Sequence, residues 1–296
     1  MELAKSHEED KYSFAVRLRE EKKFFEQAAV EGHDNTLNET IESYLWAISQ
    51  WAKFEASDFH DGSLRIFNRT VIQAGKSYHY RNAKQIEIVL YILSLREMGP
   101  FARPSVSHSG EQTFVAATTT TTGARFSTDL PFFVEDIEEE WMNDYLTLDS
   151  DSRDNLIGFI GRLVSVGLPK RLGLCALRLF HDALEAPRRL RALDAGKEVP
   201  ELNLLQAIGA WLITSNWKTW TLPSRGVQFG TALAYPGVLA CSAGVTANGF
   251  SAERWQFWVD RVREIRSQLS TEKMKELKMD HFIERLSDNS VKSVSV

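Results

Sequence analysis

The spacing of large apolar residues constrains the fold of this chain more than any other feature of its sequence. Between residues 251 and 270 they recur at steps of three, four, three and four, at Trp255, Trp258, Val262, Ile265 and Leu269. One turn of an α-helix takes ~3.6 residues, so this spacing places these side chains on one stripe of a helix. Charged residues such as Arg254 and Asp260 fall on the opposite side. We therefore predict a helix that buries both tryptophans, packed against the apolar segment 201–218.

Helical periodicity recurs along most of the chain. It is found in segments 7–31, 36–52, 63–74, 82–98, 152–166, 169–185 and 201–218. Segment 82–98 is apolar on nearly every side, which is typical of a buried helix. No series of strands and no internal repeat accompanies these segments. The predicted fold class is all-α, a globular array of about eight to eleven helices with one long Thr-rich loop.

The segment 99–130 breaks the helical pattern. It holds prolines, glycines and a run of threonines from Thr118 to Thr122. A loop of this length inside a compact domain is usually functional or disordered, and a Thr-rich composition fits a disordered or extended chain. We favour a flexible insertion over a binding loop, with a short β-ribbon between residues 113–117 and 125–127.

This loop divides the predicted helices into two groups. We expect an N-terminal helical part at 1–98 and a C-terminal helical part at 131–286, which pack together as one domain. The length of the chain suits one large domain or two small ones. Residues 287–296 carry no apolar pattern and are expected to form a disordered tail.

Composition excludes several classes of protein. The formal net charge is −5, which is unlike the basic surface of a nucleic-acid-binding protein. No apolar run approaches the ~18 residues of a membrane-spanning helix, and the N-terminus has no secretory signal. We expect a soluble cytoplasmic protein that uses no cofactor, with the nucleus left open. Cys175 and Cys241 lie in apolar runs and are expected to be buried, reduced thiols.

Familiar catalytic and metal-binding motifs are missing from the sequence. There is no H-E-x-x-H or C-x-x-C arrangement, so we predict no metal site. Ser242 lacks the first glycine and the preceding strand of a nucleophile elbow. Gly158 and Gly161 lie inside a helical pattern, where we expect them to let helices approach closely rather than to cradle a phosphate.

Four residues remain as candidates for ligand binding: His181, Trp211, Arg254 and Trp258. His181 precedes Asp182, but neighbours in a chain rarely face each other, so we do not expect this pair to act together. His181 is interpreted as a core or boundary residue of an apolar helix. The tryptophans of the last third are interpreted as core. The alternative is a flat aromatic wall for an apolar small molecule.

One segment resembles a known family. From Gly249 to Trp258 the chain is G-F-S-A-E-R-W-Q-F-W, which is similar to a G-F-S-x-E-R-W-x-F-W segment near the C-terminus of a family of filamentous-fungal proteins of unknown function. A weaker similarity covers Ala207 to Ile213, followed by Trp217. The resemblance spans residues 85–266 and implies a helical protein of fungal source, without a known substrate.

The same segment has a physical interpretation. Ser251 is expected to cap a helix, and Glu253 falls in the first turn of that helix. Arg254 is expected to pair with a carboxylate or to stack on an aromatic ring. These roles explain folding and carry no activity.

Two hypotheses for function follow. The first is a helical protein that acts by binding a protein or small-molecule partner, with loop 99–130 and the acidic surface as its variable face. The alternative is an enzyme or accessory protein of fungal specialised metabolism, with an aromatic-lined pocket and a polar residue such as His181 or Arg254. The sequence leaves open whether the chain is an enzyme, and which reaction or ligand it serves.

Overall fold

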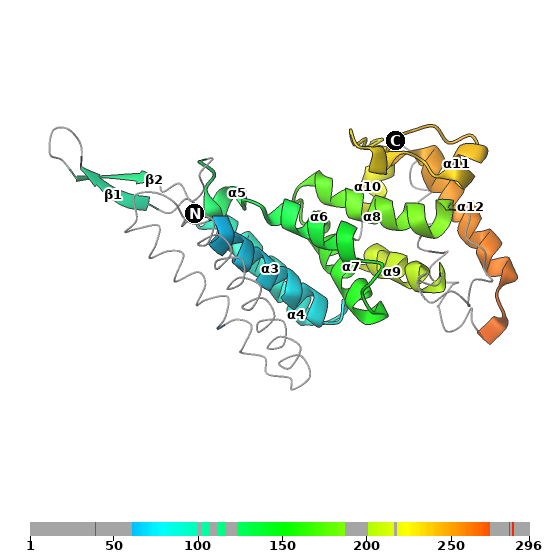
Figure 1. Cartoon of the computed structure of the whole chain (residues 1–296), viewed down its shortest axis with the longest axis horizontal. Coiled ribbons are helices and arrows are strands. Elements are labelled where there is room, and N and C mark those ends of the chain that lie inside the picture. The colour runs from blue at the N-terminus through cyan, green and yellow to red at the C-terminus, as the bar shows by residue number, and fades with distance from the viewer. Residues whose placement is uncertain are drawn as a thin grey trace, which may run out of the picture. The chain divides into compact units, whose positions relative to one another are not determined.

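Figure 1 shows the computed structural model of the chain, which describes residues 61–99, 102–106, 112–116, 123–186, 201–215 and 218–272, with Glu39, Glu284 and Leu286 as isolated positions. The helices predicted at 7–31 and 36–52, the threonine run at 118–122 and the predicted tail at 287–296 lie outside the described residues.

The described part of the chain contains ten α-helices, which confirm the predicted all-α class. They are α3 (Asp61–Ser77), α4 (Ala83–Glu97), α5 (Phe126–Asp129), α6 (Phe133–Asp144), α7 (Ser150–Ser165), α8 (Gly173–Phe180), α9 (Glu201–Thr214), α10 (Lys218–Ser224), α11 (Val238–Ser242) and α12 (Ala252–Gln268). Two 3-10 helices are η1 (Lys170–Leu172) and η3 (Ala232–Ala234). A π-helix, η2 (His181–Glu185), continues α8 without a break.

A single hairpin forms the sheet of the described residues. Its strands β1 (Ala102–Val106) and β2 (Gln112–Ala116) pair antiparallel. The ribbon strand predicted at 113–117 overlaps β2, but its predicted partner at 125–127 is wrong. Pairing with the strand just upstream closes a shorter loop, which costs less conformational entropy.

The region predicted as the partner strand forms the helical turn α5 instead. The Asp129 carboxylate accepts a hydrogen bond from the backbone N–H of Arg125 at 2.8 Å, which holds the chain in a turn. Ser127 donates from its hydroxyl to the backbone carbonyl of Gly99 at 2.6 Å. This bond brings the two ends of the predicted loop together.

The contacts between residues divide the chain into two compact units. The first comprises residues 1–78 and 82–139, and the second comprises 79–81 and 140–296. The boundary falls inside α6, and the packing of the chain as one domain stays a prediction.

Buried polar side chains tie the helices of the first unit together. Gln85 of α4 is fully buried and donates to the carbonyls of Gly75 at 2.7 Å and Tyr78 at 2.9 Å. These carbonyls lie at the end of α3, where the helix leaves acceptors unsatisfied. Asn68 of α3 donates to the buried carboxylate of Asp136 at 2.9 Å, which joins α3 to α6.

The prediction that segment 82–98 is a buried helix holds for one side of it and is wrong for the other. Ile88 and Ile92 of α4 are 1% and 2% exposed, whereas Ile86 and Leu90 are 44% and 55% exposed. Within the described residues α4 packs on α3 and α5, and these neighbours cover only one side of it.

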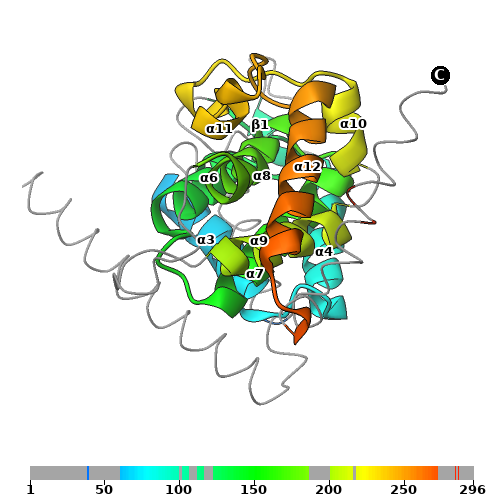
Figure 2. The same cartoon turned by 90° about the vertical axis from the view of Figure 1, so that its right-hand side faces the viewer.

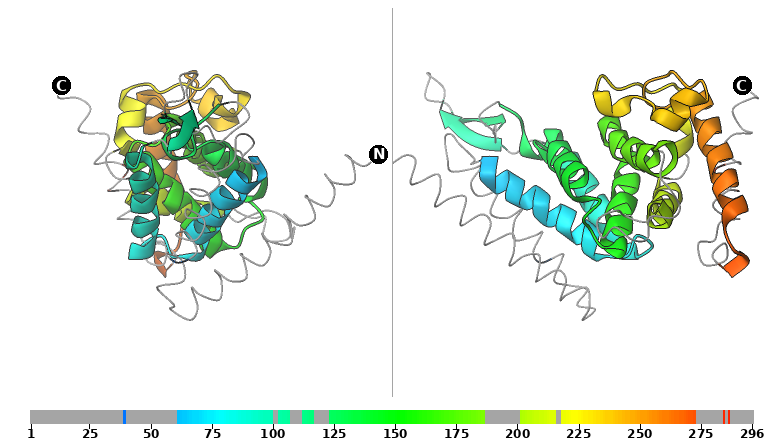
Figure 3. Two further views of the ribbon diagram at one scale, coloured as in Figure 1. Left: turned by 90° about the vertical axis from the view of Figure 1, so that its left-hand side faces the viewer. Right: turned by 45° about the vertical axis from the view of Figure 1, so that its right-hand side comes forward.

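In the second unit α7 and α9 lie side by side, as the right-hand view of Figure 3 shows. A Cβ atom on Gly161 of α7 would lie 2.4 Å from the hydroxyl oxygen of Thr214 of α9. A Cβ atom on Gly158 would lie 2.5 Å from the Cβ atom of Tyr80. The interpretation of these glycines as close-packing positions is therefore confirmed. Figure 2 shows α10 beside the first turns of α12 in the same unit.

We expect Gly161→Val to lower the free energy of unfolding by ~1–3 kcal/mol, the usual range for overpacking a core. The Thr214 hydroxyl is held by the carbonyl of Ala210 at 2.9 Å, so it has little room to move away. Denaturant midpoints measure this loss. Gly230→Val is the matched control, because no atom lies within 4 Å of a Cβ placed there. Equal stability of the two variants would contradict the close packing of α7 and α9.

Candidate functional site

The π-helix η2 carries both acidic residues of the candidate site. Its widened turn is shown by the backbone bond from the N–H of Ala186 to the carbonyl of His181, at 3.1 Å. Single π-turns within helices occur frequently at functional sites. Three titratable side chains leave this turn: His181, Asp182 and Glu185.

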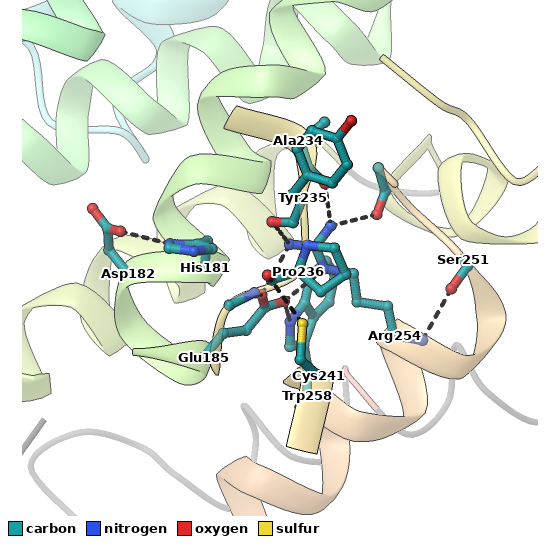
Figure 4. A network of polar contacts seen from close by, with 12 residues as sticks. His181, Asp182, Glu185, Ala234, Tyr235, Pro236, Cys241, Ser251, Arg254 and Trp258 are labelled. Atoms are coloured by element: carbon teal, nitrogen blue, oxygen red, sulfur yellow. Dashed lines mark hydrogen bonds and ion pairs between the residues drawn. The ribbon is translucent and has the colours of Figure 1, made fainter. Parts of the chain in front are cut away.

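Glu185 lies at the centre of a buried hydrogen-bond network (Figure 4). Its side chain and that of Arg254 are both 0% exposed. The carboxylate accepts bonds from Nε of Arg254 at 2.6 Å and from Nη2 at 2.9 Å. It also accepts from the indole N–H of Trp258 at 2.6 Å and from the backbone N–H of Gly237 at 2.5 Å. One carboxylate thus joins η2, α12 and the segment before α11.

The remaining donors of Arg254 bond to backbone carbonyls. Nη1 donates to Ala234 at 2.7 Å and to Gly249 at 2.9 Å. Nη2 also donates to Tyr235 at 3.2 Å. The guanidinium therefore fixes the backbone of two loops in addition to its carboxylate partner.

Local sequence explains how α12 presents these groups. Ser251 caps the helix, and its hydroxyl accepts from the N–H of Arg254 at 3.1 Å, which confirms the predicted cap. Arg254 and Trp258 are four residues apart and so share one face of the helix. Gly249 precedes the cap with φ +88°, and a Cβ atom there would lie 2.3 Å from the carbonyl oxygen of Val227. Only glycine fits this position.

A second cluster surrounds His181. Nδ1 of its ring lies 2.8 Å from Oδ1 of Asp182. The other carboxylate oxygen, Oδ2, accepts a short hydrogen bond from the Tyr145 hydroxyl and lies 3.0 Å from Nε of Arg178. Burial alone would raise the pKa of Asp182, but hydrogen bonds from His181 and Tyr145 and the charge of Arg178 hold it below its ordinary value. Asp182 is therefore an anion.

The charge on Asp182 determines how the imidazole of His181 is arranged. An anionic carboxylate only accepts hydrogen bonds, so Nδ1 is the protonated nitrogen and Nε2 of the neutral ring is an acceptor. A Cβ atom placed on Gly237 would lie 3.0 Å from this Nε2. The side chain of His181 is 25% exposed, and in the described part of the chain no group is bonded to Nε2. This arrangement, a histidine oriented by a carboxylate, is the one general bases use.

The structure corrects two expectations for these residues. The expectation that His181 and Asp182, as neighbours in the chain, do not face each other is wrong, since Nδ1 of His181 lies 2.8 Å from Oδ1 of Asp182. A π-turn separates successive residues by a smaller rotation than an α-turn, which brings neighbours toward one side. Arg254 was expected on the polar side of its helix and is instead fully buried, because Glu185 and three carbonyls compensate its charge. Its predicted pairing with a carboxylate is confirmed.

Phe250, Trp255 and Trp258 lie in the core of the second unit. The ring of Trp258 lies 4.5 Å from Phe180, 5.7 Å from Trp255 and 5.9 Å from Phe250, measured between centroids. Trp255 and Trp258 are 2% and 0% exposed, which confirms their predicted burial. These rings contact Phe180 of α8, and the main packing partner of α9 is α7, so the packing of the two tryptophans against segment 201–218 stays a prediction.

The four predicted site residues therefore differ in their surroundings. Trp211 is 0% exposed, and its indole N–H has no hydrogen-bond partner among the residues that the structure describes. Arg254 and Trp258 are also 0% exposed and bond to Glu185. Only His181 presents surface to a ligand, and ligand binding by all four stays a prediction. Glu185 was not predicted at all, because a single carboxylate in an apolar segment gives no signal of its partner.

The two cysteines are free thiols with different exposure. Cys175 is buried, as predicted, but Cys241 is exposed, so that prediction is wrong. Cys241 lies on the short helix α11, and its thiol donates outward to the carbonyl of Pro236 at 3.4 Å rather than packing inward.

We expect one fast and one slow thiol when the native protein is treated with an aromatic disulfide reagent. Cys241 reacts within the first phase because it is exposed, and Cys175 reacts only as the protein unfolds. The released thiolate, followed by absorbance, counts the reacting groups. In Cys241→Ser the fast phase disappears. Two fast thiols in the native protein would contradict the burial of Cys175.

Fold and site together define a helical protein whose most site-like feature is a histidine–aspartate pair on a π-turn. The chain belongs to the DUF3632 family of proteins of unknown function, whose family model matches residues 69–262. This match confirms the predicted membership of an uncharacterised family.

A relative comes from the fungus Penicillium oxalicum and is called oxopyrrolidines biosynthesis cluster protein G. It is 31% identical to this chain over 199 residues, which cover 61% of this chain and 53% of the relative. The chain thus spans about half the length of the curated relative it matches. No solved structure matches the chain. Among the described residues, no helix is both long enough and apolar enough to cross a membrane.

Proposed function

We propose that the chain serves fungal specialised metabolism and binds a small molecule at the open edge of His181. The observation that carries this proposal is the ring of His181, oriented by the buried anion of Asp182 and open at Nε2. Tyr145 and Arg178 hold the carboxylate from its other side, so the ring keeps one orientation. The relative's name supports the process, since it belongs by that name to a biosynthesis cluster.

The alternative form of this hypothesis, a pocket lined by the tryptophans, receives less support. Trp255 and Trp258 have almost no exposed surface, and their rings contact each other and Phe180. The network of Glu185 and Arg254 acts as the support of the site rather than as its contact surface. In this proposal a ligand touches His181, and the buried residues hold the turn that carries it.

The segment from Gly249 to Trp258 marks the family in this proposal. The roles of its residues in the structure support this. Gly249 adopts a backbone conformation that other residue types cannot adopt here, Ser251 caps α12, and the side chains of Arg254 and Trp258 both bond to Glu185. We also place the protein in the cytosol, a reducing compartment, which suits two free cysteines of which one is exposed.

Binding of a protein partner is the second candidate function. The exposed side chains of Ile86, Leu90 and Met98 on and after α4 favour it, because apolar groups gathered at a surface often mark contact sites. This surface belongs to the first unit, whereas His181 belongs to the second. The two candidates can therefore be tested by separate substitutions.

Gene deletion in the source organism, followed by mass spectrometry of secreted metabolites, tests the proposal. We expect deletion to remove or alter a specialised metabolite. The wild-type gene and Leu90→Lys restore it, whereas His181→Gln does not, although the variant accumulates as folded protein. Full restoration by His181→Gln, or an unchanged metabolite profile after deletion, would overturn the proposal. Failure of Leu90→Lys alone would favour the protein-binding candidate.

A further inference from the structure

The segment beside His181 exposes an unusual number of large apolar side chains. Leu233, Tyr235 and Val238 are 40%, 56% and 64% exposed, and they fall within six consecutive residues. Gly237, in the same segment, is the residue that approaches Nε2 of His181. An open hydrogen-bond acceptor therefore lies beside a concentration of exposed apolar surface. We name residues 233–238 the apolar edge.

The backbone of the apolar edge is fixed from inside the protein. Arg254 donates to the carbonyl of Tyr235, and Glu185 accepts from the N–H of Gly237. The carbonyl of Ala234 accepts from Arg254 and also from the N–H of Gly249 at 2.9 Å. The side chains are thus exposed on a rigid support, and a ligand that binds them does not have to order the loop.

Charge selects the kind of ligand that suits this surface. The charges that the structure places near His181 compensate each other, Asp182 with Arg178 and Glu185 with Arg254. Neither pair leaves a net charge for an ionic ligand. Nε2 of His181, which lies beside Gly237 and bonds to no group in the described part of the chain, is an acceptor, and an acceptor recognises a hydroxyl or N–H group.

We propose that His181 and the apolar edge form a binding site for a neutral, largely apolar small molecule that presents one hydroxyl or N–H donor to Nε2. This inference rests on the proposed function, since it names the ligand class of the same site. The two halves of this site are His181 and the apolar edge. Gly237 sets the distance between them, because a Cβ atom at this position would come within 3.0 Å of Nε2 of His181 and within 2.7 Å of the Cβ atom of Glu185.

Two small probes test the ligand class. 4-Methylphenol has an apolar body and one donor, and 4-methylanisole has the same body with the donor blocked. Titration of each into full-length, 15N-labelled protein is followed by the NMR shifts of the His181 ring nitrogens and of the Tyr235 amide. We expect 4-methylphenol to shift both signals and to bind about five-fold more tightly than 4-methylanisole, the factor for one net hydrogen bond.

Variants separate the contributions of the two halves. His181→Gln has no imidazole ring signals, so binding to this variant is followed by the Tyr235 amide alone. In this variant we expect the ratio of the affinities for 4-methylphenol and 4-methylanisole to differ from the wild-type ratio. Val238→Ser weakens both probes alike, and its 64% exposure leaves the fold intact. Gln256→Ala is the control, because this exposed side chain bonds only to Asp260 among the described residues. A thermal unfolding curve confirms that each variant is folded.

The outcomes distinguish this inference from the proposed function. Equal binding of the two probes, or shifts that avoid His181 and Tyr235, would overturn the ligand class, even where His181→Gln abolishes metabolite production. Selective binding of 4-methylphenol combined with full restoration by His181→Gln would support the binding site and overturn the role of His181 in metabolism.

Discussion

Arg254→Met is expected to lower the free energy of unfolding by about 3–5 kcal/mol, the range found when one partner of a buried ion pair is removed. The reason is the charge left behind. The carboxylate of Glu185 is 0% exposed and would lose the two bonds from the guanidinium, at 2.6 Å and 2.9 Å. The carbonyls of Ala234, Tyr235 and Gly249 would lose the hydrogen bonds from the guanidinium as well.

The double variant Glu185→Leu/Arg254→Met tests whether the loss comes from the uncompensated charge. Replacing both partners of a buried pair by apolar residues is often far less harmful than replacing one. We expect the double variant to be more stable than Arg254→Met, with a coupling of about 0.5–3 kcal/mol between the two sites. Denaturant midpoints of the three variants supply this comparison. Additive losses, or a loss under about 1 kcal/mol for Arg254→Met, would show that the pair is not buried as described.

Trp258→Ala is expected to lower the free energy of unfolding by ~3–5 kcal/mol, the range for removing a large aromatic side chain from a core. The indole ring is 0% exposed and contacts Phe180, Trp255 and Phe250, so its removal leaves a cavity between three other rings. The N–H bond to Glu185 at 2.6 Å is lost at the same time. Such a loss is a large share of the ~5–15 kcal/mol that stabilises a typical protein.

Two further variants separate packing from hydrogen bonding at this position. Trp258→Phe keeps most of the ring and loses the N–H group, and it is expected to be less destabilised than Trp258→Ala. Tyr235→Ala is the control, because this aromatic side chain is 56% exposed and its removal should change stability by less than about 0.5 kcal/mol. A loss below about 1 kcal/mol for Trp258→Ala would favour a ligand pocket over a packed core.

Helical spacing predicted the parts of the fold that depend on local sequence. The stripe containing Trp255 and Trp258 identified α12 and its buried face, and Ser251 identified the start of that helix. Gly158 and Gly161 were interpreted correctly because their setting within a helix left close packing as the simplest reason for a missing side chain. Each of these predictions uses only residues within a few turns of one another.

The candidate site depends on contacts that local sequence does not contain. Glu185 and Arg254 are separated by 69 positions, and neither residue gives a signal in the local sequence that predicts its partner. The burial of Arg254 follows from that pairing, so a pattern of polar and apolar residues placed it on the wrong side of α12. His181 and Asp182 face each other through a π-turn, which does not follow the 3.6-residue period on which the sequence prediction relied.

The central claim, that Asp182 orients His181 and leaves Nε2 open as an acceptor, is tested most directly by the 15N chemical shifts of the two ring nitrogens. They are measured in the full-length protein as the pH is raised until the shifts no longer change. The account predicts a single neutral tautomer with the proton on Nδ1, and a mixture of tautomers in Asp182→Asn. A proton found on Nε2 in the wild-type protein, or the same mixture in both proteins, would contradict it.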